Sequence, residues 1–109
     1  MALLNWLQSP ASPRQIAAWG LEVAQQCQNE VALRLGQTVH RLSLPAARGY
    51  IRARAAAVLE EEMNLLLERT GCSSALAAAI RNRAMDDIVR MAIGDVLKTA
   101  RPLVQRKAA

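Results

Sequence analysis

The sequence predicts an all-α protein: an antiparallel three-helix bundle with long helices, an N-terminal apolar arm and a basic C-terminal tail. Hydrophobic residues make up 52% of the 109 residues, which is ample for one core, whereas aromatic residues make up only 3%. The alanine run at 55–57 favours helices whose axes approach closely. We expect an arm at 1–12, the bundle at 13–100 and the tail at 101–109.

The first helix is predicted over 13–42. Ser12 can cap its free amides, and Pro13 fits the first turn because that position needs no N–H. Apolar residues then recur at spacings of three and four, which is the pattern of one buried helix face. Gly36 lies off this stripe and offers an earlier end, as a left-handed cap followed by a short connector. The stripe consists of Ile16, Gly20, Val23, Cys27, Val31, Leu35, Val39 and Leu42.

The second helix is predicted over 45–69. Ser43 and Pro45 repeat the start signal, and Gly71 supplies a stop signal. The inward face again follows the helical period. Its members are Ile51, Ala55, Leu59, Met63 and Leu66.

The third helix is predicted over 74–100, with Ser73 or Ser74 as its cap and Pro102 just beyond its end. Short connections between the three helices predict an antiparallel bundle. The inward positions of this helix are Leu76, Ile80, Ala84, Ile88 and Met91.

The charged residues support this topology. Folding the third helix back on the second places Arg81 beside Glu62, and Arg54 near Asp86 and Asp87. Exposed pairs of this kind contribute about 0 to 1 kcal/mol each, so they select register more than they stabilise. The same complementarity suits the second helix pairing antiparallel with its own copy in a two-fold dimer.

The net charge of +5 collects at the end of the chain. Lys98, Arg101, Arg106 and Lys107 supply four positive charges with no acidic residue among them. A basic tail on a nearly neutral body makes nucleic acid the alternative partner. Phosphate contacts would come from Arg101, Arg106 and Lys107, helped by Arg48 and Arg52.

The sequence offers little for catalysis. His40 is the only histidine, and Cys27 and Cys72 match neither a disulfide framework nor a metal-ligand spacing. The acidic run at 60–62 cannot converge on one ion, because consecutive helix positions point about 100° apart. We therefore expect no enzyme activity, no cofactor and no metal. Cys72, beside the glycine of a turn, is the better candidate for a reactive thiol, although a plain turn residue is the simpler interpretation.

Protein contacts are the favoured function. Trp6 and Leu7 belong to an apolar arm ahead of the first helix, which either folds back over the end of the bundle or onto Trp19, or docks on another subunit or partner as a hydrophobic anchor. The helices also carry more apolar positions than one stripe each requires, which predicts a second interaction face and a homo-oligomer, with a dimer favoured, or a helical protein partner. The alternative is that a three-helix core, in which each helix touches two neighbours, uses these wide stripes itself. The second face consists of Leu67, Met85, Val89 and Val96. No segment reads as a membrane span, and the cysteine pattern favours a soluble, cytoplasmic protein.

Overall fold

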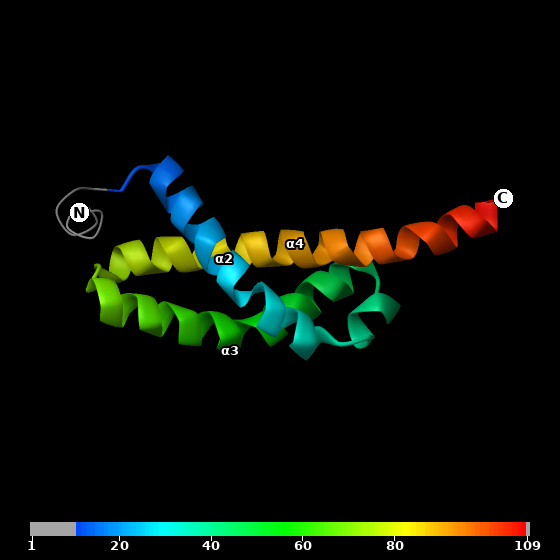
Figure 1. Cartoon of the computed structure of the whole chain (residues 1–109), viewed down its shortest axis with the longest axis horizontal. Coiled ribbons are helices and arrows are strands. Elements are labelled where there is room, and N and C mark those ends of the chain that lie inside the picture. Colours follow the sequence, from blue (N-terminus) through cyan, green and yellow to red (C-terminus); the bar gives the residue numbers. More distant parts are fainter. Residues whose placement is uncertain (1–10, 109) are drawn as a thin grey trace.

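The computed structural model describes residues 11–108, with side chains described through residue 98. Within these residues the chain forms three α-helices and one short 3-10 helix, and no strand. The predicted all-α three-helix bundle is confirmed (Figure 1). In chain order the elements are α2 (Pro13–Leu35), η1 (Thr38–Arg41), α3 (Leu44–Thr70) and α4 (Ser74–Ala108).

Serine side chains start all three helices. Ser12 and Gln15 form a reciprocal capping box, in which each backbone N–H donates to the other side chain at 3.0 and 3.1 Å. The Ser43 hydroxyl accepts from the Ala46 N–H at 3.4 Å, and the Ser73 hydroxyl accepts from the Leu76 N–H at 3.1 Å. The predicted start signals are thus confirmed, and Ser73 rather than Ser74 caps α4.

The first helix is shorter than the predicted 13–42. It ends at Leu35 because Gly36 adopts φ 55°, a conformation that only glycine enters at low cost. The ψ of −144° differs from the expected left-handed cap, and the chain turns instead into η1. Gly71 closes α3 with φ 62° and ψ 24°, the left-handed cap that its position predicts.

The last helix is longer than predicted. The α4 backbone continues through Pro102 to Ala108, although the sequence predicts an end near residue 100 and a separate tail at 101–109. A proline removes one N–H and its ring crowds the preceding turn, yet the neighbours of Pro102 retain helical backbone conformation. The proline therefore does not terminate this helix.

The three helices pack around one core. Arg81 of α4 pairs with Glu60 of α3 at 2.9 Å, and Arg52 pairs with Asp86 at 3.1 Å, so α3 and α4 run in opposite directions. Each pair uses a residue two positions away from the predicted partner, because packed helices incline instead of lying strictly parallel. In Figure 1, α2 crosses α4 obliquely.

Gly20 lies where α2 makes a close contact with α4. A Cβ atom at this position would lie 2.6 Å from Arg83 Cγ, 2.8 Å from Arg83 Cβ and 3.3 Å from the backbone nitrogen of Ala84. Any larger residue would therefore push the two helices apart. This close contact gives the glycine on the predicted stripe a packing role.

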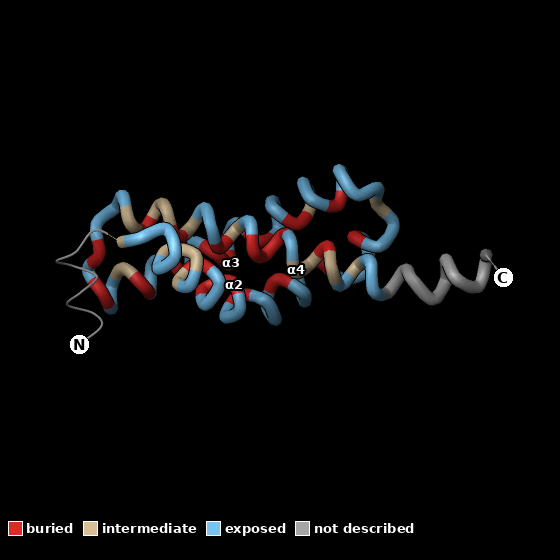
Figure 2. Tube along the Cα trace, turned by 90° about the horizontal axis from the view of Figure 1, so that it is seen from above, coloured by how far each residue is buried: buried red, intermediate tan, exposed pale blue. Residues whose placement is uncertain are grey.

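The core agrees with the predicted helix faces. All five predicted α3 positions are buried, and Ile51, Met63 and Ile80 are fully enclosed. Figure 2 shows the buried positions on the inward sides of the three helices. Ile16, Leu42, Leu76 and Met91, which lie at the ends of the predicted stripes, are half-buried.

Candidate interaction surfaces

The predicted second apolar face is mostly used within the chain. Val89 is only 8% exposed and belongs to the core, while Leu67, Met85 and Val96 are half-buried and pack against it. Val89 is thus already covered within one copy, and the assignment of this face to contacts with a partner stays a prediction. Val89 is covered because α4 contacts both α2 and α3, so it needs a wide apolar sector for one copy to fold.

Some predicted contact residues lie outside the part of the chain that is described. The anchor residues Trp6 and Leu7 precede residue 11. The side chains of Arg101, Arg106 and Lys107 follow residue 98. Their assignments stay predictions.

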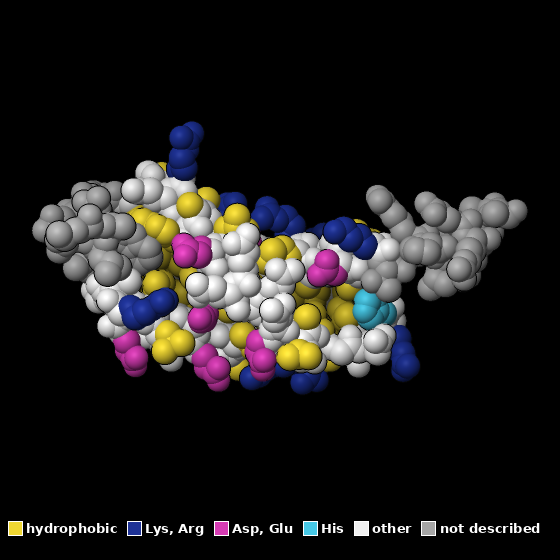
Figure 3. All heavy atoms as spheres, in the orientation of Figure 1, with side chains coloured by type: hydrophobic (Ala, Val, Ile, Leu, Met, Phe, Trp, Pro, Cys, Tyr) yellow, Lys and Arg dark blue, Asp and Glu magenta, His cyan; other side chains and the backbone are white. Residues whose placement is uncertain are grey.

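An apolar groove opens where α2 ends. It lies between the last turns of α2, η1 and the middle of α4, and it holds about 110 Å³. In Figure 3 it is the yellow hollow beside the single histidine side chain. The apolar side chains that line it are Val31, Ala32, Leu35, Val39, Ile88, Met91, Ala92 and Val96.

Two local features produce the groove. Gly36 ends α2 and turns the chain away, whereas α4 continues past this point and is left partly uncovered. Ala32 and Ala92 line the hollow, where larger side chains would fill it. The sequence pattern assigns Val31, Leu35 and Val39 to the core, but it does not show that their outer edges line an open groove.

Polar groups lie at the rim of this groove. Gln28, His40 and Asp95 line it together with the apolar residues, and neither cysteine does. His40 is exposed. Among the described side chains, no three of His, Cys, Asp and Glu are grouped so as to hold a metal ion.

The two cysteines are both buried and free. Burial, with a smaller contribution from the charge of Glu62, raises the pKa of Cys27 from 9.0 to about 11. Cys72 is 7% exposed, and its backbone N–H donates to the Thr70 hydroxyl at 3.3 Å. Burial makes Cys72 a poor candidate for the reactive thiol suggested by its place in a turn.

The predicted phosphate-binding arginines of α3 differ in their partners. Arg52 is neutralised by Asp86 at 3.1 Å, whereas the Arg48 side chain has no ion pair with another described residue. The Arg54 guanidinium stacks 5.0 Å above the ring of Tyr50, so one face of that ring is occupied. This arrangement leaves Arg48 as the one predicted α3 contact still open to a phosphate.

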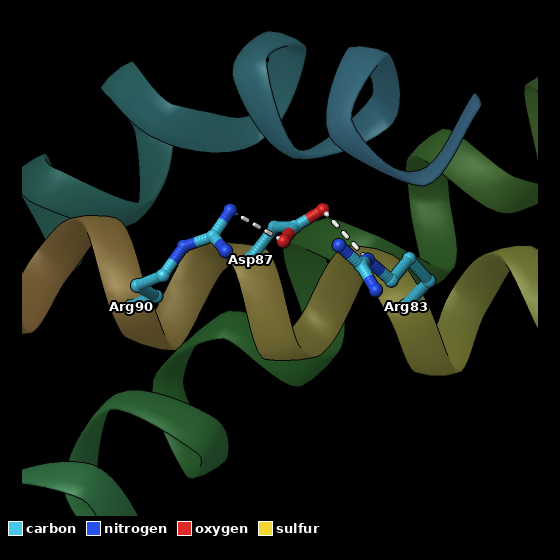
Figure 4. A network of polar contacts seen from close by, with 3 residues as sticks. All are labelled: Arg83, Asp87 and Arg90. Carbon is cyan, nitrogen blue, oxygen red and sulfur yellow. Dashed lines mark hydrogen bonds and ion pairs between the residues drawn. The ribbon is translucent and has the colours of Figure 1, made fainter. Parts of the chain in front are cut away.

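A buried carboxylate between α2 and α4 is not predicted by the sequence reasoning. The side chain of Asp87 is 2% exposed, and Figure 4 shows it between Arg83 and Arg90 with α2 passing over it. Arg90 binds Oδ1 at 2.7 Å, while Arg83 lies 3.5 Å from Oδ2, which accepts no hydrogen bond. The expectation that Asp87 faces Arg54 is wrong, because the crossing of α2 covers this side of α4. The spacing of the two arginines, four residues before and three after the aspartate, is the signal that could have revealed the cluster.

Comparison with known proteins does not place this chain in a family. No protein-family model, curated protein or solved structure matches it. None of its described helices combines the length and the apolar character needed to cross a membrane.

Proposed function

We propose that this chain is a non-catalytic assembly module that associates with copies of itself by inserting an apolar segment into a groove. The observation that carries the proposal is the apolar groove between α2, η1 and α4, with Met91, Ala92 and Val96 only partly covered. Covering apolar surface of this kind with a second apolar segment lowers the free energy, because water is removed from both surfaces. The occupant that we propose is the N-terminal arm of another copy, with Trp6 and Leu7 as its anchors.

The length of the chain argues that the arm comes from another copy. Five residues lie between Trp6 and Ser12, and the six Cα–Cα steps span at most about 20 Å at roughly 3.4 Å per residue. The lining of the groove begins at Gln28, about 22 Å along α2 from Pro13 at 1.5 Å per residue, and its apolar part begins at Val31. Within its own chain a fully extended arm therefore reaches at most the near edge of the groove, which favours another copy as the source of the anchor residues.

Nucleic acid is the alternative partner. Among residues 11–98, eleven lysines and arginines face nine aspartates and glutamates, so the described body carries little excess charge. A phosphate-binding helix usually presents an unneutralised basic face, and Arg52 is paired. We therefore rank this function second and make it an outcome of the test.

The experiment measures molar mass by light scattering after size-exclusion chromatography, with absorbance at 260 and 280 nm. We expect the parent chain to form a dimer or larger species, and Trp6→Ala with Leu7→Ala to dissociate it. Ala92→Phe should also dissociate it, because the added ring fills the groove. Leu33→Ala is the matched control: Leu33 is 77% exposed and lies outside the groove, so the mass should not change.

Only variants that circular dichroism shows to be folded are compared. Loss of association in both the arm and the groove variants supports the proposal. A monomeric parent, or variants that keep the parent mass, would overturn it. A nucleic-acid absorbance ratio that disappears at high salt and in Arg106→Gln with Lys107→Gln would favour the alternative.

A further inference from the structure

One side of α3 faces away from both other helices and is lined by three alanines, a tyrosine, an asparagine and two glutamates. These positions recur at spacings of three and four, so they form a continuous stripe along the helix. All of them are exposed except Tyr50, which is half-buried. The stripe, which we call the outer face, consists of Ala46, Tyr50, Ala53, Ala57, Glu61, Asn64 and Glu68.

Leu65 and Arg54 flank the outer face. Leu65 is 52% exposed, although it is a large apolar residue. Arg54 reaches back over the Tyr50 ring at 5.0 Å and forms no ion pair among the described side chains. Glu61, seven residues later, likewise has no ionic partner there. An apolar group and two opposite charges are thus available on one side of the helix.

The order of these charges is unfavourable within a single helix. The basic Arg48 and Arg54 lie toward the N-terminus of α3, and the acidic Glu61 and Glu68 lie toward its C-terminus. This order opposes the helix macrodipole, which favours acidic residues at the start and basic residues at the end. Acidic side chains accordingly gather along the lower left edge of Figure 3, where Figure 1 places the second half of α3.

We propose that α3 packs antiparallel against α3 of a second copy, around a two-fold axis that passes beside Ala57. In this register Arg54 of each copy lies opposite Glu61 of the other, because both residues are about equally far from the axis. Tyr50 and Leu65 are also equidistant from it and meet in the same way. The axis repeats each contact, so one dimer contains two such ion pairs and two such apolar contacts.

The charge pattern selects this orientation over the others. A parallel pairing in register would set Arg54 against Arg54 and Glu61 against Glu61, which is repulsive. A parallel pairing shifted by seven residues would join only one Arg54 to one Glu61 and would leave the other two charges free for further copies. Only the antiparallel pairing satisfies both charges of both chains. The alanines at 53 and 57 allow the helix axes to approach closely at the centre.

Charge exchange on the outer face tests this interface. We expect Arg54→Glu and Glu61→Arg each to raise the dimer dissociation constant by about tenfold or more, because each turns two attractions into two repulsions. The double variant Arg54→Glu with Glu61→Arg should return to within about threefold of the parent. The matched controls are Arg34→Glu and Glu30→Arg, which change net charge equally on exposed positions of α2 and should leave the dissociation constant unchanged.

The inference rests on the self-association proposed above but uses a different surface, so the two can fail separately. Single variants that keep the parent affinity, or a double variant that stays dissociated while remaining folded, would overturn the α3 interface. If the charge variants behave as expected while Trp6→Ala with Leu7→Ala keeps the parent mass, the α3 interface is supported and the arm proposal is wrong. A parent chain that is monomeric at every concentration would overturn both.

Discussion

Replacing Gly20 by alanine tests the helix crossing on which the bundle depends. Alanine normally stabilises a helix interior by about 1 kcal/mol relative to glycine. At this position, however, the new methyl group would lie within 2.8 Å of two Arg83 carbons and 3.3 Å from the Ala84 backbone nitrogen. Overpacking of a close contact costs about 1 to 3 kcal/mol. We therefore expect Gly20→Ala to lower the free energy of unfolding by up to about 2 kcal/mol.

Two other glycines provide the matched controls. Gly94 lies within α4 and Gly49 within α3, and a Cβ atom at either position would meet nothing within 4 Å. Gly94→Ala and Gly49→Ala should therefore stabilise by about 0.5 to 1 kcal/mol from helix propensity alone. The difference between the Gly20 variant and these controls is then about 1 to 3 kcal/mol.

Urea unfolding followed by circular dichroism measures these differences. A change of 1 kcal/mol shifts the melting temperature of a domain of this size by about 4 to 8 °C, so thermal melts provide a second readout. If Gly20→Ala stabilises the protein as much as Gly94→Ala does, then α2 and α4 do not meet at this residue, and the crossing is refuted.

Three further outcomes follow from the structure. Replacing Arg83 and Arg90 together by methionine should lower the free energy of unfolding in urea by about 3 to 5 kcal/mol, because it leaves the 2%-exposed Asp87 carboxylate without a cation. Adding Asp87→Asn should recover much of the loss. A triple variant that recovers nothing would contradict the role of the cluster. Burial raises the pKa of Cys27 from 9.0 to about 11, so the protonated thiol contributes roughly 2 to 3 kcal/mol to the free energy of unfolding. This contribution should be complete below pH 9 and lost as the pH rises through 11. A Cys27→Ala variant with the same alkaline loss of stability would argue against this. Ser73→Ala should destabilise the protein by about 1 kcal/mol because α4 loses its cap, whereas Ser74→Ala should not. Equal melting temperatures for the two variants would count against the capping assignment.

Local features of the sequence predicted the helices well. Caps such as Ser12 and Ser43 act through hydrogen bonds within three residues, so their effect can be read from neighbouring positions. The α3 core follows in the same way, because the helical period alone decides which side chains share a face. The end of α4 was harder to predict, because a proline weakens a helix without always ending it.

Features that depend on how the helices cross were not predictable from periodicity. Asp87 is buried only because α2 passes over it, and the sequence does not state where that crossing occurs. Val89 was assigned to a second interaction face because its helix carries two apolar rows, and the packing decides that Val89 is buried inside one copy. The groove likewise depends on where α2 stops relative to α4.

If the arm of one copy binds the groove of another, as proposed, the direction of α2 gives each copy a donor end and an acceptor end. The arm precedes Pro13 at one end of the helix, and the groove adjoins Leu35 at the other. Copies that all point the same way would add one after another into a fibre of indefinite length, since each new copy leaves a fresh donor and acceptor exposed. Two copies that point in opposite directions place each donor end beside the other's acceptor end, so growth stops at two. Under the proposed arm-to-groove contact, the relative direction of neighbouring molecules would therefore decide between a filament and a closed pair.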